Sequence, residues 1–150
     1  YEPFELPGRR MNTSRGWEIF PRIIYDMAMR IKNDYRNIDW FVAESGMGVE
    51  NEVQYRNRDG VIDDTYRIAF ISEHLYYTLL AREAGANCHG YMLWAFTDNV
   101  SPMNAFKNRY GLIEIDLENQ RARRAKKSAS WFRQLRDERV LTLRVDDEWK

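Results

Sequence analysis

Two short apolar runs interrupt a chain that otherwise mixes apolar and polar positions. NIDWFVAES at 37–45 and CHGYMLWAF at 88–96 are rich in apolar and aromatic residues and carry no helical period. Runs of this length without a 3.6-residue period are typical of buried strands. We therefore predict one strand in each segment.

Helical patterns flank and separate these two runs. PRIIYDMAMRIKNDY at 21–35 has a proline near its first turn, and DDTYRIAFISEHLYYTLLAREAG at 63–85 spaces its apolar residues as a helix does before a terminal glycine. KKSASWFRQLRDE at 126–138 predicts a third helix. Residues 1–20 and 97–109 predict loops, and GLIEID at 111–116 predicts a third apolar strand or extension.

This order of elements predicts an α/β fold. Helices that alternate with strands form parallel sheets covered by helices, either open and doubly wound or closed as an eightfold barrel. In both architectures the active groups gather at the carboxyl ends of the strands. Glu44, in WFVAESGMGV, lies at such an end, and so does the loop after Phe96.

Composition narrows the function further. The 150 residues suit one domain, and 44% apolar residues predict a packed core. Lys and Arg together number 23, as do Asp and Glu, so overall charge favours neither nucleic acid nor an anionic membrane. The single cysteine, Cys88, excludes an internal disulfide and predicts a reducing, cytoplasmic compartment. The chain begins on Tyr1, the kind of start expected of a piece of a longer product.

Several candidate motifs predict no special chemistry. His74, His89 and Cys88 match no metal-ligand spacing, so helix-surface and strand-packing roles are favoured and no metal or cofactor is expected. RARRAKK at 121–127 lacks aromatic interleaving and predicts a solvated basic face at the entrance to a helix.

The remaining candidates bear on sugar chemistry. A carboxylate such as Glu44 on a rigid strand end is most often an ordinary loop residue, but it can also be aimed at a substrate carbon, as a retaining glycosidase requires. Trp94 is either core or a platform beneath a sugar ring. A phosphate dianion could be bound by three side chains of one loop: the hydroxyl of Ser101, the ammonium of Lys107 and the phenol of Tyr110. Each has a simpler alternative: a turn for Ser101, a solvated charge for Lys107 and packing alone for Tyr110.

Together these motifs resemble family 1 glycoside hydrolases. AESGMGV is similar to the family's Thr-Glu-Asn-Gly nucleophile signature, with Ala43 and Ser45 in place of Thr and Asn. DDTYRIAFISEHL, HGYMLWAFTDNVS, RYGLIEID and KKSASWF resemble the blocks that follow it, in the same order. The resemblance implies the C-terminal portion of a (β/α)8 TIM barrel, incomplete as an isolated chain. Residues 1–150 would hold the last two or so β/α units and the final helix of a single barrel domain.

The resemblance also implies residue roles. Glu44 would be the nucleophile of a retaining double displacement. Trp17 would line the aglycone side of the substrate pocket. Its neighbour Arg15 occupies a position where the family usually has a Trp. Where the family usually has a Glu-Trp whose glutamate binds sugar hydroxyls, this chain has Ser101-Pro102. A serine at this position is similar to the 6-phospho-β-glycosidase branch. In that branch the serine and a nearby Lys and Tyr bind the 6-phosphate. Pro102, where galactoside-preferring members have Trp, favours 6-phosphoglucosides. In that branch a Lys often directly precedes Arg-Tyr; here that position is Asn108, and Lys107 stands one place earlier.

The implied acid/base carboxylate is missing from these residues. No Asn-Glu-Pro occurs, and the only Asn-Glu, Asn51-Glu52, is followed by Val53. We therefore expect the 150 residues by themselves not to hydrolyse glycosides efficiently, and to self-associate or need the rest of the barrel because sheet edges stay unpaired. Two alternatives stay open: a β-glucosidase of unphosphorylated sugars, and a non-catalytic fragment that serves as a binding or interaction module.

Overall fold

The centre of the fold is a pair of parallel strands, β3 (Trp40–Ser45) and β5 (Cys88–Leu93), in the computed structural model, which describes residues 7–143. Helix α1 (Ile23–Asp34) precedes β3, and α2 (Thr65–Glu83) connects β3 to β5. Parallel strands need a long crossover connection, and α2 provides it. The two predicted strands and the first two predicted helices are confirmed.

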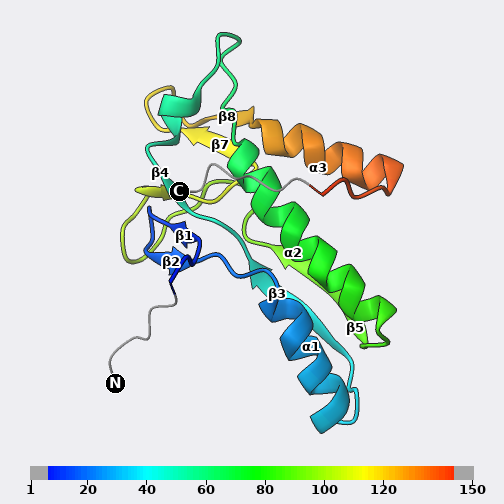
Figure 1. Ribbon diagram of the computed structural model, residues 1–150. Helices are drawn as coiled ribbons and strands as arrows, with labels where there is room; N and C mark the ends of the chain where they lie inside the picture. The colour runs from blue at the N-terminus through cyan, green and yellow to red at the C-terminus, as the bar shows by residue number, and fades with distance from the viewer. Residues whose placement is uncertain (1–6, 144–150) are drawn as a thin grey trace.

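Helix α2 packs against both other helices and a strand. It contacts α1, β5 and the third helix, α3 (Lys127–Glu138), and Figure 1 shows it running between α1 and α3. Where α1 meets α2, the buried residues are the small Ala28, Ala81 and Ala86, against which Trp40 packs from β3. Small side chains let the two helices approach closely, and the indole fills the space beside them.

The segment after the second strand forms a hairpin rather than a third parallel strand. Strand β7 (Ile113–Asp116) pairs antiparallel with β8 (Ala122–Ala125), and α3 begins two residues later. GLIEID is therefore a strand, as predicted. It also lies parallel to the segment that follows β5, through a bridge between Thr97 and Ile113 and through the N–H of Ile113, which donates to the Phe96 carbonyl at 3.0 Å. The stretch 121–127 was expected to be a solvated basic face. It contains β8, and Arg121, Arg123, Arg124 and Lys127 are exposed as expected, whereas Lys126 is buried.

Short strands tie the loops together. The opening segment, predicted as a loop, contains a small hairpin of β1 (Met11–Asn12) and β2 (Trp17–Glu18). After β3 come β4 (Val49–Glu50) and the 3-10 turn η1 (Glu52–Tyr55), and β4 pairs with β6 (Asn108–Arg109), which lies inside the second predicted loop. The pairing of β4 with β6 fixes the loop after β3 against the loop after β5.

One face of the β3–β5 pair is left bare within residues 7–143. Phe41 and Met92 are each more than half exposed, and Phe96 beyond the strand end is 72% exposed. A closed barrel would bury such a face against the other strands. The described chain is thus an open portion of a barrel wall. No helix among residues 7–143 combines the length and apolarity that crossing a membrane requires.

Candidate active site

Glu44 stands at the carboxyl end of β3 with its side chain exposed. The register of β3 against β5 shifts between Val42 and Ser45, and the consecutive residues Ala43 and Glu44 are both exposed. A bulge of this kind inserts one residue and re-aims the side chains that follow. Within residues 7–143 the Glu44 carboxylate has no hydrogen bond or ion pair. It is therefore free to face a substrate.

Trp94 lies at the end of the strand that neighbours β3. It directly follows β5, and its backbone N–H donates to the carbonyl of Ser45 at 2.8 Å. Its side chain is 41% exposed, which argues against a simple core role. An exposed indole offers the apolar face on which a pyranose ring stacks. The structure thus brings Glu44 and Trp94 to the same edge, as their places in the sequence predict.

The two glycines of SGMG make this edge compact. A Cβ at Gly46 would lie 1.6 Å from the Trp94 carbonyl oxygen, and a Cβ at Gly48 would lie 2.4 Å from Cζ of Tyr110. No side chain fits at either position, so only glycine allows the chain after β3 to touch both neighbours. The SGMG segment therefore packs between two candidate site residues, Trp94 and Tyr110.

Ser101 opens a tight turn. Its backbone N–H and carbonyl exchange hydrogen bonds with Ala105 at 2.9 and 2.8 Å, and its Oγ accepts from the N–H of Met103 at 3.2 Å. The hydroxyl is held in place by that contact while its own proton remains available to a ligand. The turn reading of this serine and its predicted role as a phosphate donor are therefore compatible.

Lys107 and Tyr110 differ in their surroundings. The Lys107 side chain is exposed, and its Nζ lies 3.1 Å from Oε1 of Glu50. Tyr110 is only 8% exposed, its ring packs on Gly48, and its carbonyl accepts from Arg67 at 3.1 Å. The structure gives the Tyr110 ring a packing role, and its binding role stays a prediction.

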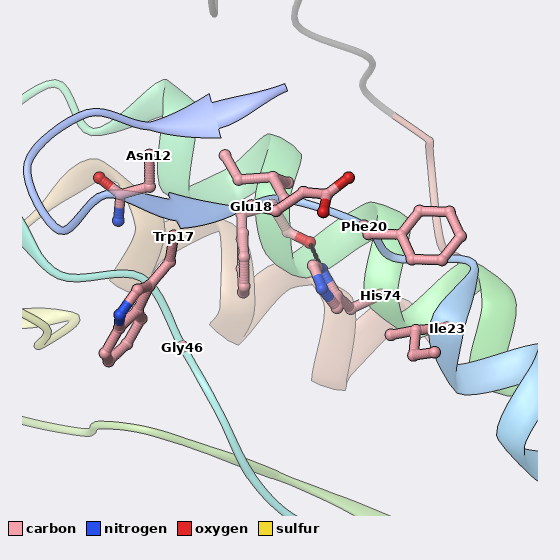
Figure 2. Close-up of a pocket in the computed structure, with 9 residues that line it drawn as sticks. Asn12, Trp17, Glu18, Phe20, Ile23, Gly46 and His74 are labelled. Atoms are coloured by element: carbon pink, nitrogen blue, oxygen red, sulfur yellow. Dashed lines mark hydrogen bonds between the residues drawn. The ribbon is translucent and has the colours of Figure 1, made fainter. Parts of the chain in front are cut away.

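Trp17 lies on the far side of the SGMG segment. It is 51% exposed, and the Arg15 guanidinium lies over its ring at 4.4 Å from the centroid. Trp17 lines a pocket of about 210 Å³, shown in Figure 2, whose other residues include Gly46 and His74. The indole thus forms one wall of a hollow next to the strand end that carries Glu44.

His74 occupies the inner wall of this pocket. It was expected on the surface of its helix, but it is buried, and its Nδ1 contacts the Phe70 carbonyl at 2.6 Å, the dashed line in Figure 2. Burial lowers the pKa of His74, against the opposing effects of the Phe70 carbonyl and of Glu73. Because a carbonyl only accepts hydrogen bonds, Nδ1 donates its proton to Phe70, and burial favours the neutral imidazole.

A buried ionic network lies beneath the loops of the site. Lys126, expected on a solvated face, is 1% exposed, and its Nζ pairs with Glu52 and, at 2.9 Å, with Asp98. Asp98 also accepts from the backbone N–H of Gly111 at 2.9 Å and of Ile115 at 3.3 Å. A buried charge is tolerated when it is paired and hydrogen-bonded, and here it anchors the start of the Ser101 loop.

Arg67 completes the network from α2. Its five N–H donors reach five acceptors, namely Asp64, Glu52 and the carbonyls of Met47, Arg109 and Tyr110. Burial alone would lower the pKa of Arg67, but Glu52, Tyr66 and Asp64 outweigh it and raise the pKa. The side chain joins the segment after β3 to the segment before β7. Sequence reasoning did not identify it, because an arginine inside an apolar helix pattern gives no sign of its partners.

Glu52 is not available as a second catalytic carboxylate. It is 2% exposed, and its oxygens are held by Arg67, Lys126 and the Tyr66 hydroxyl. Across residues 7–143, no three His, Cys, Asp or Glu side chains come together as metal ligands. Around the strand ends, the described residues offer the exposed Glu44 carboxylate, exposed indoles and a polar loop.

These features define a class of protein: an α/β-barrel wall whose candidate site residues gather at the carboxyl ends of its strands. The model of glycosyl hydrolase family 1 matches residues 7–140, and the chain belongs to this family. It is 47% identical over 135 residues to the 6-phospho-beta-glucosidase GmuD of Bacillus subtilis, covering 90% of this chain and 29% of that protein. It is 40% identical over 141 residues to a 6-phospho-beta-galactosidase of Clostridium acetobutylicum, covering 89% and 29%.

Solved structures agree on the fold. A beta-glucosidase from Thermotoga maritima superposes with a TM-score of 0.80 at 24% identity, covering 93% of this chain and 30% of that one. This confirms the predicted α/β fold, the C-terminal portion of a (β/α)8 TIM barrel. The chain spans about 30% of the length of these relatives, and residues 7–143 form no closed barrel.

Proposed function

We propose that this chain is part of a retaining 6-phospho-β-glucosidase, which hydrolyses β-glucosides phosphorylated at O6 to glucose 6-phosphate and an aglycone. The observation that carries the proposal is the exposed Glu44 carboxylate at the end of β3, without a hydrogen bond or ion pair among residues 7–143, with Trp94 at the neighbouring strand end and the Ser101 turn after it. The names of the two curated relatives, a 6-phospho-beta-glucosidase and a 6-phospho-beta-galactosidase, support a phosphorylated substrate.

The proposed reaction has two displacements. A Glu44 oxygen attacks the anomeric carbon while a separate carboxylic acid protonates the leaving oxygen, and a glycosyl-enzyme forms. The same acid, now a carboxylate, then takes a proton from water, which attacks the anomeric carbon and releases Glu44. Trp94 supports the sugar face during both steps, and Trp17 walls the aglycone side.

The second carboxylate must come from outside this chain. Glu52, in the only Asn-Glu, is buried and bound by two cations. We propose accordingly that residues 1–150 are the C-terminal part of one barrel domain, inactive in isolation and prone to self-associate through the bare face of β3 and β5. A monomeric isolated chain with a sharp, cooperative melt would contradict the self-association. A reducing, cytoplasmic location fits both the buried thiol of Cys88 and a sugar-phosphate substrate.

The phosphate would be held by Ser101, Lys107 and Tyr110. A hydroxyl and an ammonium suit a dianion, whereas a carboxylate at position 101 would repel it. Lys107 is paired with Glu50, so a phosphate would share or replace that partner. Pro102 after the serine, and the higher identity to the glucosidase relative, favour the gluco over the galacto configuration.

The experiment that tests the substrate class is Ser101→Glu in the protein that carries this chain. We expect kcat/KM for an aryl 6-phospho-β-glucoside to fall by about 10- to 100-fold, the value of a lost charge-assisted hydrogen bond, while hydrolysis of the unphosphorylated glucoside changes little. Ser130→Glu, which adds the same charge on the exposed side of α3, is the matched control and should change neither rate.

An enzyme for unphosphorylated sugars is the second candidate, since the solved structure named above is a beta-glucosidase. If that candidate is right, glucose inhibits as well as glucose 6-phosphate, and the wild-type protein shows no preference for the phosphorylated substrate. A purely binding module would bind glucose 6-phosphate with no turnover in the complete protein.

A further inference from the structure

Arg15 is a part-buried cation without an anionic partner. Its Nε is buried and makes no hydrogen bond within residues 7–143, and its Nη1 contacts only the neutral Oδ1 of Asn108, at 3.5 Å. Arg10, Arg56 and Arg67, by contrast, each pair with a glutamate. A desolvated guanidinium normally has a carboxylate or another anion beside it. Among residues 7–143, Arg15 therefore has donors that an anionic ligand could fill.

Asn108 holds this arginine toward the Ser101 turn. It is 1% exposed; its Oδ1 accepts from Nδ2 of Asn104 at 2.5 Å as well as from Arg15, and its Nδ2 donates to the Ser14 carbonyl at 3.4 Å. Asn108 thus lies between the guanidinium and residue 104. On the other side of the guanidinium, the ring of Trp17 limits its movement.

The neighbouring turn is where the proposed phosphate would bind. Asn104 lies inside the turn closed by Ser101 and Ala105, and its carbonyl accepts from the backbone N–H of Lys107 at 3.0 Å. Lys107 already has a carboxylate partner in Glu50, so it brings little unbalanced positive charge to a dianion. One side chain, Asn108, separates that turn from a cation whose charge is not balanced.

We propose that Arg15 is a second cationic ligand of the substrate's phosphate, a specificity residue oriented by Asn108 and Trp17. This inference rests on the proposed function. The planar guanidinium offers paired N–H donors that match two phosphate oxygens, and it stays charged at every pH at which the phosphate is a dianion. Arg15 thereby supplies positive charge to the phosphate, whereas the charge of Lys107 is already balanced by Glu50.

The test is a pair of variants in the protein that carries this chain, Arg15→Gln and Arg15→Lys, assayed on matched aryl β-glucosides with and without a 6-phosphate. We expect Arg15→Gln to raise KM for the phosphorylated substrate about tenfold or more, with kcat and the unphosphorylated reaction little changed. Arg15→Lys should recover part of the loss, because it keeps the charge but not the fork. Arg58→Gln, at an exposed arginine whose side chain makes no hydrogen bond or ion pair among residues 7–143, is the control.

The outcomes separate this inference from the function on which it rests. If the wild type prefers the phosphorylated substrate and Arg15→Gln alters both substrates equally, or neither, then Arg15 only packs on Trp17 or serves the aglycone, and the inference is wrong. The circular dichroism spectrum and the melting temperature of Arg15→Lys should equal those of the wild type. This shows that a higher KM reflects lost binding and not misfolding. A wild type without that preference overturns the proposed function and this inference together. If Arg15→Gln weakens only the reaction of the phosphorylated substrate and Arg15→Lys recovers part of it, the result supports both the proposed function and the role of Arg15.

Discussion

Replacing Glu44 with Gln is expected to lower kcat/KM of the protein that carries this chain by roughly three orders of magnitude or more. An amide of the same shape fits the site but cannot form the ester to the anomeric carbon. Each tenfold loss corresponds to about 1.4 kcal/mol of transition-state stabilisation, so the expected deficit is at least about 4 kcal/mol. Steady-state rates on an aryl 6-phospho-β-glucoside measure it directly.

Two controls give this result its meaning. Glu118→Gln removes an exposed carboxylate from the β7–β8 turn and should leave the rate unchanged. Glu44→Ala supplemented with azide should form the α-glycosyl azide, because a small anion then attacks from the face that Glu44 vacated. A β-glycosyl azide would instead identify Glu44 as the acid/base, and an active Glu44→Gln would exclude it from catalysis.

Replacing Lys126 with Met is expected to produce the largest loss of stability. The change leaves Glu52 and Asp98 buried with one cation fewer, and breaking a buried ion pair on one side costs roughly 3–5 kcal/mol of the free energy of unfolding. The Ser101 loop should also loosen, since Asp98 anchors its first residues. Urea unfolding followed by circular dichroism measures the loss in the protein that carries this chain.

The adjacent lysine is a matched control. Lys127 also pairs with a carboxylate, Asp63 at 2.9 Å, but both side chains are more than two-fifths exposed. Lys127→Met should therefore cost less than about 1 kcal/mol. Similar losses for the two lysines would mean that the buried network contributes no more than a surface pair.

The main elements could be predicted because they carry local signals. Both parallel strands lie in short segments rich in apolar residues, α2 has helical spacing before a terminal glycine, and α1 follows a proline that marks its start. Strands β4 and β6 could not be predicted, since two residues hold no period and pair only because α2 and the loops bring them together. Strand β8 has no apolar signal at all; its pairing with β7 supplies the hydrogen bonds, and Arg124 pairs with Asp116 across the hairpin.

In the candidate site, too, some features could be predicted from the sequence and others could not. The position of Glu44 at a strand end follows from the sequence, whereas its exposure depends on a bulge that no pattern indicates. The burial of Lys126 depends on Glu52 and Asp98, which lie 74 and 28 positions away along the chain. The contact of Arg15 with Asn108 spans 93 positions. Side chains that acquire their roles from such distant partners look like ordinary surface charges in a sequence.

The most direct test of the account is covalent labelling of Glu44. A 2-deoxy-2-fluoro-β-glucoside with an activated leaving group slows the release of the glycosyl-enzyme and so traps it, and peptide mass spectrometry locates the modified residue. With the protein that carries this chain, we expect the 6-phosphorylated reagent to modify Glu44, and to do so at a much lower concentration than the unphosphorylated reagent. Modification of another carboxylate, or equal labelling by the two reagents, would contradict the claim that Glu44 is a nucleophile facing a phosphosugar pocket.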